Sequence, residues 1–354
     1  MTSIPPTPDA IDARWLEAAL SEPFPGTRIA SVGVEALSHG TNDNARLRVA
    51  YTTAAGAPQH FFAKCPPTDP RQRSLVLESG MGRREVLFYR HLANRVPMRV
   101  PRGFVAQYDA GDGRFALLVE DLEMSGCSFP TDEKGVGLHL AESAMKNFAD
   151  LHALFRPGAE DAPDWIEPPL RQPAYARAML EHALSTRPET LTPAYTSIAR
   201  LYIERGEAVH DLWEEGSPVA THGDAHLANL FIDGDRLGFL DWGCFAWAPA
   251  MRDVGYFLCM ALSIADRRRH ERELIGQYLE HRRRAEGDAP SLEDAWTAHR
   301  LQASYTVIAA APAVLNPRRP GDASGAYAAD FVARASAAIE DLETVPLLQS
   351  RLGL

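Results

Sequence analysis

VATHGDAHLANLFIDGDRLGFLDWG, which spans residues 219–243, is the stretch that decides the fold. Its centre predicts a β-hairpin, in which residues 229–232 pair with residues 237–240 around an Asp-Gly-Asp turn. Helical sequence patterns precede and follow it. We therefore expect a short β insert in a helical region, with polar residues at the open end of the hairpin.

Three oxygen-bearing side chains gather at that open end. Pairing around the turn brings Asn229 and Asp241 together, and Asp224 lies on the loop leading in, five residues before Asn229. Oxygen ligands suit a hard cation such as Mg²⁺, which takes one or two protein groups together with phosphates and water. Asp and Asn are also common caps and turn formers, so each residue alone indicates little. The set at this spacing favours a metal site.

The same spacing is typical of phosphoryl transfer. An Asp, an Asn five residues later and an Asp-x-Gly after a hairpin form the catalytic-loop and metal-loop pattern of kinases. Here it reads His222-Gly223-Asp224, Asn229 and Asp241-Trp242-Gly243. The stretch resembles the aminoglycoside phosphotransferase and choline kinase superfamily, whose loop reads His-Gly-Asp where protein kinases read His-Arg-Asp. Within it, the chain looks most like the ecdysteroid-kinase-like branch.

The resemblance runs from about residue 28 to residue 262 and includes shorter pieces in the expected order. They are Gly40-Thr41-Asn42, Ala63-Lys64, Arg84-Glu85-Val86-Leu87-Phe88-Tyr89 and Glu120-Asp121-Leu122. The resemblance implies a bilobal, protein-kinase-like fold with ATP and Mg²⁺ as cofactors. In that scheme Asp224 is the catalytic residue, which orients the acceptor hydroxyl and takes its proton, and Asn229 and Asp241 hold the metal.

Strand patterns in the first third of the chain predict a five-stranded antiparallel sheet interrupted by one helix. The strands are expected at 29–37, 45–52, 60–65, 103–108 and 115–120, the helix at about 75–92, and a further short helix, capped by Asp9, at 9–20. From about residue 136 the patterns are helical, at 138–155, 174–184, 193–214, 251–265 and 267–285, with a further C-terminal set. Strands followed by helices indicate the α+β class.

The composition changes near residues 120–122, where we place the hinge. We predict an N-terminal helix and linker at 1–28, a nucleotide-binding N-lobe at 29–120, and a catalytic and substrate-binding C-lobe at 121–354.

Lys64 is one of only three lysines among 36 basic residues, so its use is unusual for this chain. It ends the third strand and is a plausible cation for the α and β phosphates of the nucleotide. Glu85 projects from the apolar stripe of its predicted helix. A buried carboxylate needs a partner, and Lys64 is the natural one. The alternatives are a solvated edge-strand lysine and a glutamate that reaches solvent.

The remaining nucleotide contacts rest mainly on the resemblance. The turn that contains Gly40 and Thr41 has a single glycine, unlike the glycine-rich loop of protein kinases, and its side chains could supplement backbone N–H groups over the phosphates. Backbone groups of Glu120 and Leu122 would meet the adenine. By the same resemblance, Asp253 braces the catalytic loop.

The acceptor is predicted to be a small molecule with a hydroxyl group. Only about five residues separate Gly243 from the next predicted helix, which leaves no room for the activation segment that holds a peptide in protein kinases. Aromatic and Met residues downstream favour, weakly, a fairly apolar hydroxylated metabolite. Nothing in the sequence indicates the oligomeric state.

Two other classes of function stay open at this stage. One is a metal-dependent hydrolase in which His222, Asp224 and His226 are the metal ligands. This interpretation leaves Lys64 and Glu85 unexplained. The other is a nucleotide-binding pseudokinase that regulates a partner.

Composition narrows the class of protein. Of the 354 residues 45% are hydrophobic and 23% charged, which is ordinary for a globular chain. The net charge of −11 argues against a nucleic-acid binder. Four cysteines form no Cys-x-x-Cys pair, and no apolar run approaches the length of a membrane span. We therefore expect a soluble, cytoplasmic protein.

Overall fold

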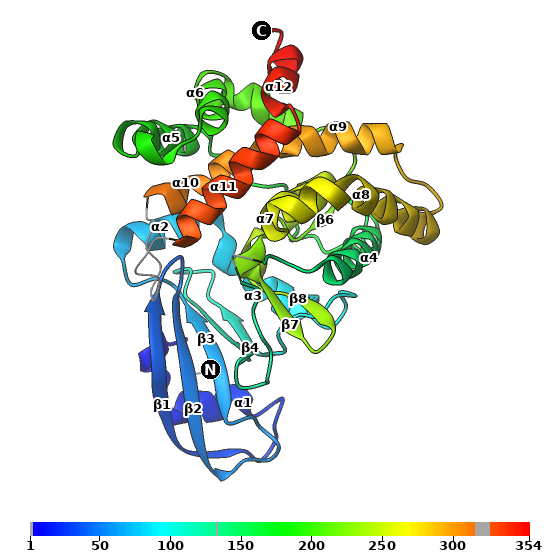
Figure 1. The fold of residues 1–354 in the computed structure, drawn as a ribbon. Coiled ribbons are helices and arrows are strands. Elements are labelled where there is room, and N and C mark those ends of the chain that lie inside the picture. The colour runs from blue at the N-terminus through cyan, green and yellow to red at the C-terminus, as the bar shows by residue number, and fades with distance from the viewer. Residues whose placement is uncertain (1–2, 132–133, 316–325) are drawn as a thin grey trace. The chain divides into compact units, whose positions relative to one another are not determined.

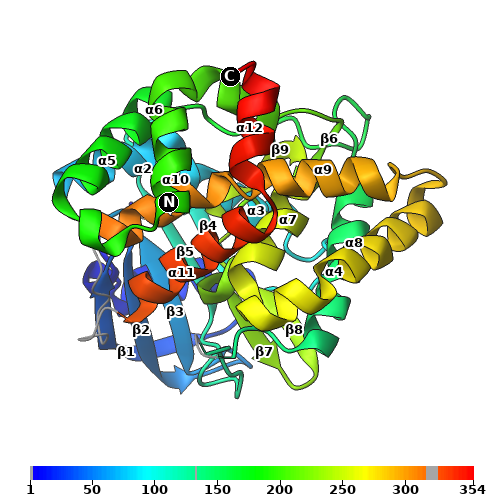
Figure 2. The same cartoon turned by 45° about the horizontal axis from the view of Figure 1, so that its top comes forward.

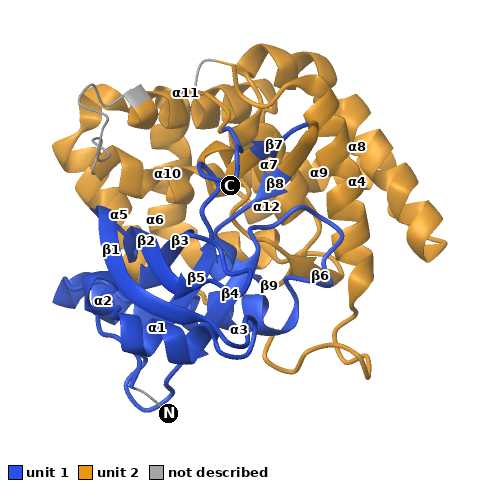
Figure 3. Ribbon diagram, turned by 90° about the horizontal axis from the view of Figure 1, so that it is seen from below, with its two compact units in different colours: residues 1–128, 232–234, 238–245 blue, residues 129–231, 235–237, 246–354 orange. Residues whose placement is uncertain are grey.

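The computed structural model describes residues 3–131, 134–315 and 326–354. The chain divides into two compact units, coloured separately in Figure 3. Unit 1 comprises residues 1–128, 232–234 and 238–245, and unit 2 the remainder. The predicted boundaries at residues 28 and 120 stay a prediction.

Unit 1 contains the predicted five-stranded antiparallel sheet, in the order β1-β2-β3-β5-β4 (Figure 1). Its strands are β1 (Arg28–His39), β2 (Asp43–Thr53), β3 (His60–Cys65), β4 (Gly103–Tyr108) and β5 (Phe115–Glu120). Alternate residues of β2, namely Ala45, Leu47 and Val49, are buried on one face. They belong to one hydrophobic cluster with Trp15 and Leu16 of α1 (Ala13–Leu20).

The helices of unit 1 differ in detail from the expectation. The cap of α1 is Asp12, whose carboxylate accepts the N–H of Trp15 at 2.7 Å, and not Asp9, which lies in the preceding short turn Pro8–Ala10. The single helix expected at 75–92 is two helices, α2 (Pro70–Ser79) and α3 (Met81–His91). Gly80 separates them because it adopts a left-handed conformation with φ 69°, which ends a helix.

Unit 2 is mainly helical, as predicted. Its helices are α4 (Leu138–Leu154), α5 (Pro173–Thr186), α6 (Pro193–Trp213), α7 (Met251–Ala261), α8 (Ile264–Glu286), α9 (Leu292–Gln302), α10 (Tyr305–Leu315), α11 (Ala326–Asp341) and α12 (Thr344–Leu352), with short 3₁₀ turns at Pro188–Thr190 and Leu227–Asn229. In both Figures 1 and 2, α4 and α8 run side by side. Helix α7 ends before the expected residue 265, because Ser263 caps α8 through the N–H of Asp266.

The β insert is present. Strand β6 (Pro218–Thr221) pairs antiparallel with β9 (Ala246–Pro249). Strands β7 (Leu230–Asp233) and β8 (Arg236–Phe239) form the predicted hairpin, with Gly234 at φ 63° in its turn. A short 3₁₀ turn, Trp242–Cys244, follows the hairpin. The α+β fold class with its five-stranded sheet is thus confirmed.

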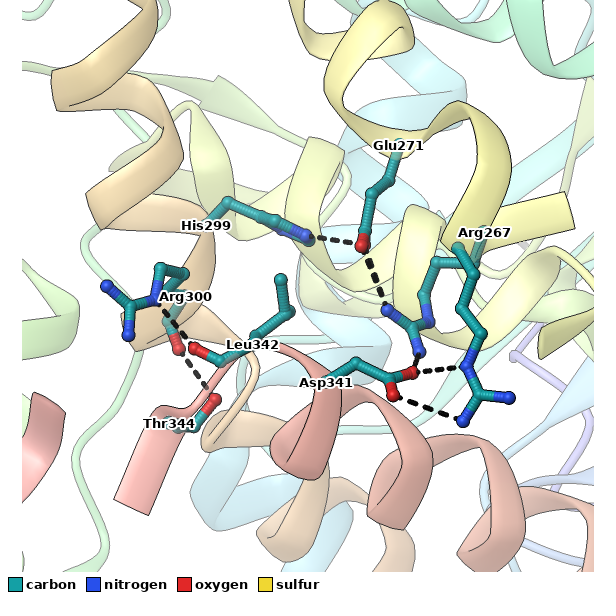
Figure 4. A network of polar contacts seen from close by, with 8 residues as sticks. Arg267, Glu271, His299, Arg300, Asp341, Leu342 and Thr344 are labelled. Carbon is teal, nitrogen blue, oxygen red and sulfur yellow. Dashed lines mark hydrogen bonds and ion pairs between the residues drawn. The ribbon is translucent and has the colours of Figure 1, made fainter. Parts of the chain in front are cut away.

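Buried charges connect the C-terminal helices of unit 2 (Figure 4). Arg267 of α8, fully buried, pairs with Glu271 at 3.0 Å and with Asp341 of α11. His299 of α9 approaches the carboxylate of Glu271 at 3.2 Å. Arg300 donates to the carbonyl of Leu342 at 2.6 Å. These contacts pair the buried Arg267 with two carboxylates, as a buried ion requires, and they link α8 with α9 and α11.

No described helix, across 3–131, 134–315 and 326–354, is both long enough and apolar enough to cross a lipid bilayer.

A crowded glycine gives a test of packing in unit 2. At Gly135 (φ 61°) an added Cβ would lie 2.6 Å from the backbone N of Ser263 and 2.7 Å from the carbonyl O of Ala261. Gly158 has a similar φ of 78° but open space around it. We expect Gly158→Ala to cost about 1 kcal/mol for the left-handed backbone. Gly135→Ala should cost about 3 kcal/mol or more, because overpacking adds to that strain.

Urea unfolding of both variants measures the difference. Equal losses would show that the backbone around residues 261–263 moves aside without cost.

Candidate active site

Lys64 in unit 1 lies between two carboxylates. Its place near the end of β3 is fixed by pairing with Asn44 of β2 and Leu117 of β5. The ammonium donates to Glu85 Oε1 at 2.7 Å and to Asp241 Oδ1 at 3.3 Å. Lys64 is 8% exposed and Glu85 2%. The structure thus brings together three predicted site residues from β3, α3 and the segment after β8.

Burial and neighbouring charges shift the pKa values of Lys64 and Glu85. Burial opposes the charge of Lys64, but the carboxylates of Asp241 and Glu85 outweigh it and raise the pKa of the ammonium. Burial raises the pKa of Glu85 to about 6, although the charge of Lys64 opposes this rise.

Asp241 has an unusual backbone. Its φ is 63° and its ψ 70°, a left-handed conformation that is costly for a residue with a side chain. Such strain persists only where surrounding contacts enforce it and is typical of functional sites. Here Trp242 stacks on Phe88 of α3, with ring centroids 3.9 Å apart, and Arg84 Nε donates to the carbonyl of Gly243 at 2.9 Å. Sequence patterns did not indicate the anchoring role of Arg84.

Asp224 and Asn229 meet in unit 2. Asn229 Nδ2 donates to the carbonyl of Asp224 at 2.9 Å and to its carboxylate Oδ2 at 3.0 Å. The amide nitrogen of Asn229 therefore faces Asp224, which leaves its oxygen for other partners. The Asp224 side chain is partly exposed.

The loop that carries Asp224 is held by hydrogen bonds to Asp253 of α7. The backbone N–H groups of His222 and Gly223 donate to the Asp253 carboxylate, each at 2.7 Å. The N–H of Asp224 donates to His222 Nδ1 at 3.2 Å. Gly223 has φ 82°, so the tight turn between His222 and Asp224 requires a glycine.

The predicted hydrolase ligands are engaged in other contacts. Nδ1 of His222 accepts the Asp224 N–H, and Nδ1 of His226 accepts the N–H of Ala228 at 3.3 Å. Among residues 3–131, 134–315 and 326–354, no group of three or more His, Cys, Asp or Glu side chains is placed to hold a metal ion. Nothing in this geometry favours the hydrolase interpretation.

The remaining predicted nucleotide contacts lie in unit 1. Gly40 and Thr41 are exposed in the tight connection between β1 and β2. Glu120, at the end of β5, is held by Arg99 at 2.8 Å and by the N–H of Arg102 at 3.0 Å. The carbonyl of Leu122 accepts the N–H of Cys127 at 2.9 Å. The adenine contacts of these backbone groups stay predictions.

Comparison with models of protein families assigns the chain to one of them. Residues 34–290 match the model of the phosphotransferase enzyme family (APH). The chain belongs to this family. Membership confirms both the predicted superfamily and the predicted enzyme class: the protein is a phosphotransferase. The closer assignment to the ecdysteroid-kinase-like branch stays a prediction.

Solved structures agree on the fold of this phosphotransferase. A choline kinase from Cryptosporidium parvum Iowa II has a TM-score of 0.54 and 14% identity, with 91% of each chain covered. The choline kinase LicA from Streptococcus pneumoniae has a TM-score of 0.52 and 13% identity, covering 93% of this chain and 98% of its own. A spectinomycin phosphotransferase in complex with ADP and spectinomycin has a TM-score of 0.52 and 12% identity, covering 94% and 99%. The protein-kinase-like fold is thereby confirmed.

A search of curated proteins returned no match.

The phosphotransferase has oxygen donors that fit Mg²⁺. The side-chain oxygen of Asn229 in unit 2 and the carboxylate of Asp241 in unit 1 are each a hard ligand of the kind that Mg²⁺ takes. Around Lys64 two carboxylates face one ammonium, which leaves a local charge of 1 − 2 = −1. This excess of negative charge suits a cation.

The buried Glu85 should give a measurable pH dependence of stability. Its pKa is about 6 in the folded chain against 4.5 unfolded, so the folded chain binds the proton more tightly. The resulting stabilisation is present below pH 4.5 and is lost as the pH rises through 6, a change of about 2 kcal/mol. Compared with Glu85→Gln, the wild-type protein should therefore gain about 2 kcal/mol in relative stability between pH 7 and pH 4.

Urea unfolding of both proteins across this pH range checks the sign. A stability difference that does not change with pH would contradict it.

Proposed function

We propose that this phosphotransferase is a small-molecule kinase that moves the γ-phosphate of ATP to a hydroxyl group of its acceptor. The observation that carries the proposal is the contact of Lys64 with both Glu85 and Asp241, because a structural ion pair needs one carboxylate and this cation has two. Phosphoryl transfer depends mainly on positioning and on neutralising phosphate charge. The two carboxylates position the ammonium of Lys64, and a cation attracted by the net negative charge of the cluster would supply the further neutralisation.

In the proposed reaction Lys64, oriented by Glu85, neutralises charge on the α and β phosphates. Asn229 and Asp241 would hold Mg²⁺, which when bound neutralises the charge of the phosphates. The strained backbone of Asp241 is fixed by the contacts of Trp242 and Gly243, so its carboxylate is positioned before the nucleotide binds. Preorganised charge of this kind lowers the barrier without reorganisation during the reaction.

Asp224 would orient the acceptor hydroxyl and accept its proton. Asn229 Nδ2 holds one carboxylate oxygen at 3.0 Å, and the side chain is exposed enough for a hydroxyl to reach it. Two hydrogen bonds to Asp253 fix the backbone of the two residues immediately before Asp224. These restraints support the role of a positioned general base.

The short connection after Asp241 supports a small acceptor. The 3₁₀ turn Trp242–Cys244 leads directly into β9, and β9 leads into α7. A protein kinase places a long peptide-binding segment at this point of the chain. The spectinomycin phosphotransferase and choline kinases of similar fold carry small molecules in their names, which is consistent with this class of acceptor.

Three matched variants separate the proposed roles. Asp224→Asn should lower kcat by about 10²- to 10⁴-fold, the range for a general base, while the Kd for Mg-ATP stays near the wild-type value. Asp241→Asn should instead weaken Mg-ATP binding. Asp235→Asn, at the exposed hairpin turn, is the control for the same chemical change and should leave both constants unchanged. A fully active Asp224→Asn enzyme would remove Asp224 from the catalytic role.

An untargeted experiment can find the acceptor. We expect that incubating the protein with Mg-ATP and a cell metabolite extract produces a compound that gains a phosphate, detected by mass spectrometry. The Asp224→Asn variant is the negative control. If no compound gains phosphate in any extract, although Mg-ATP binds, the pseudokinase alternative is favoured.

A further inference from the structure

A chain of buried hydrogen bonds leads away from the catalytic loop inside unit 2. It starts at Asp253, which accepts the N–H groups of His222 and Gly223. Nε2 of His152 in α4 lies 3.1 Å from Asp253 Oδ2, and Nδ1 of His152 lies 2.9 Å from the hydroxyl of Tyr278 in α8. Arg282 Nη1 donates to that hydroxyl at 2.7 Å. Four side chains from three helices thus form one network.

The network has one consistent direction of donation. The Asp253 carboxylate can only accept, so Nε2 of His152 carries the hydrogen and donates to it. In the neutral imidazole Nδ1 is then an acceptor and takes the hydroxyl hydrogen of Tyr278, whose oxygen accepts from Arg282. This arrangement requires a neutral imidazole. His152 is fully buried, and burial lowers its pKa, which agrees with the neutral form.

The carboxylate of Asp253 is therefore oriented from two sides. Its Oδ2 receives both the N–H of His222 and Nε2–H of His152, and its Oδ1 receives the N–H of Gly223. Without the hydrogen bond from His152, the carboxylate could rotate about its Cβ–Cγ bond and release one of the two loop N–H groups. Those N–H groups fix the peptide units directly before Asp224, and misplacing a catalytic group by about 1 Å can cost about 10²-fold in rate.

We propose that His152 is a positioning residue for Asp224, acting through Asp253 and held in the required tautomer by Tyr278. The effect on rate rests on the proposed function, since it needs Asp224 as the base. The effect on the loop does not, because it depends only on the hydrogen bonds within unit 2.

Two substitutions at residue 152 separate positioning from packing. The side-chain nitrogen of His152→Gln can reach the place of Nε2 and keep the bond to Asp253. The shorter side chain of His152→Asn ends near Nδ1 and cannot. Both replace the ring by a neutral amide, and the Asn variant lacks one methylene group that the Gln variant keeps. Tyr278→Phe is a third variant, which keeps the tyrosine ring in α8 and removes only its hydroxyl.

Hydrogen–deuterium exchange of the intact protein measures the loop directly and needs no acceptor. We expect exchange at the amides of residues 222 and 223 to rise at least tenfold in His152→Asn. In His152→Gln it should stay within about threefold of the wild-type rate, and Tyr278→Phe should lie between the two. The thermal midpoint of the Asn variant should be the lower of the two, because Asn also loses the packing of one buried methylene group, so the local exchange at residues 222 and 223 is the readout of positioning. Equal exchange rates in these two variants would overturn the proposal.

Kinetics with Mg-ATP and the acceptor found above complete the test. His152→Asn should lower kcat by about 10- to 100-fold with little change in KM for ATP, and His152→Gln should recover most of the loss. Equal losses in both variants would show a structural role only. Failure of the proposed function is distinguishable, because Asp224→Asn would then remain active while the exchange pattern of the residue 152 variants is unaffected.

Discussion

The buried ammonium of Lys64 is the constraint on which the rest of unit 1 depends. Taking a charge out of water costs several kcal/mol, and here Glu85 and Asp241 offset that cost from α3 and from the segment after β8. Removing either carboxylate would leave a buried charge less well compensated. Three segments distant in the chain are therefore tied to one cation. The left-handed backbone of Asp241 is tolerated because this tie, the Trp242–Phe88 stack and the bond from Arg84 all hold it.

Unit 2 also contains a buried ion, which has the opposite charge. Asp253 is a buried carboxylate, and its partners are two backbone N–H groups and the ring of His152 in place of a cation. Hydrogen bonds from backbone N–H groups stabilise a carboxylate without adding another charge to the core. The consequence is that the conformation of the loop, and not the position of a mobile side chain, satisfies the buried ion. The loop that carries Asp224 and the packing of α4, α7 and α8 are thereby specified together.

The sequence predicted what depends on local signals. Turn residues and alternating apolar positions predicted all five strands of the sheet and the hairpin of β7 and β8. The need of a buried carboxylate for a partner predicted the pair Lys64–Glu85, and motif spacing predicted that Asp224 and Asn229 lie close together. Helix ends were less certain, because Asp9 and Asp12 are equally good caps on sequence alone and Gly80 is tolerated inside a helical pattern. The contacts of Arg84 and His152 had no sequence signal. Their partners lie 159 and 101 residues away, and only the folded chain brings them close.

Arg99 lies outside every motif, but its contacts help to fix the position of Asp241, one of the proposed metal ligands. Its carbonyl accepts the N–H of Phe239 in β8, and its side chain pairs with Asp233 in β7 at 2.7 Å and with Glu120 at 2.8 Å. One arginine thus attaches both strands of the hairpin to the end of β5, and β5 is the strand next to β3, which carries Lys64. Asp241 follows β8 by only two residues. Its position relative to Lys64 is therefore fixed twice, through the ion pair itself and through the hairpin backbone. Because both restraints act before any ion is bound, we expect the proposed ion to bind where the fold already holds Asp241.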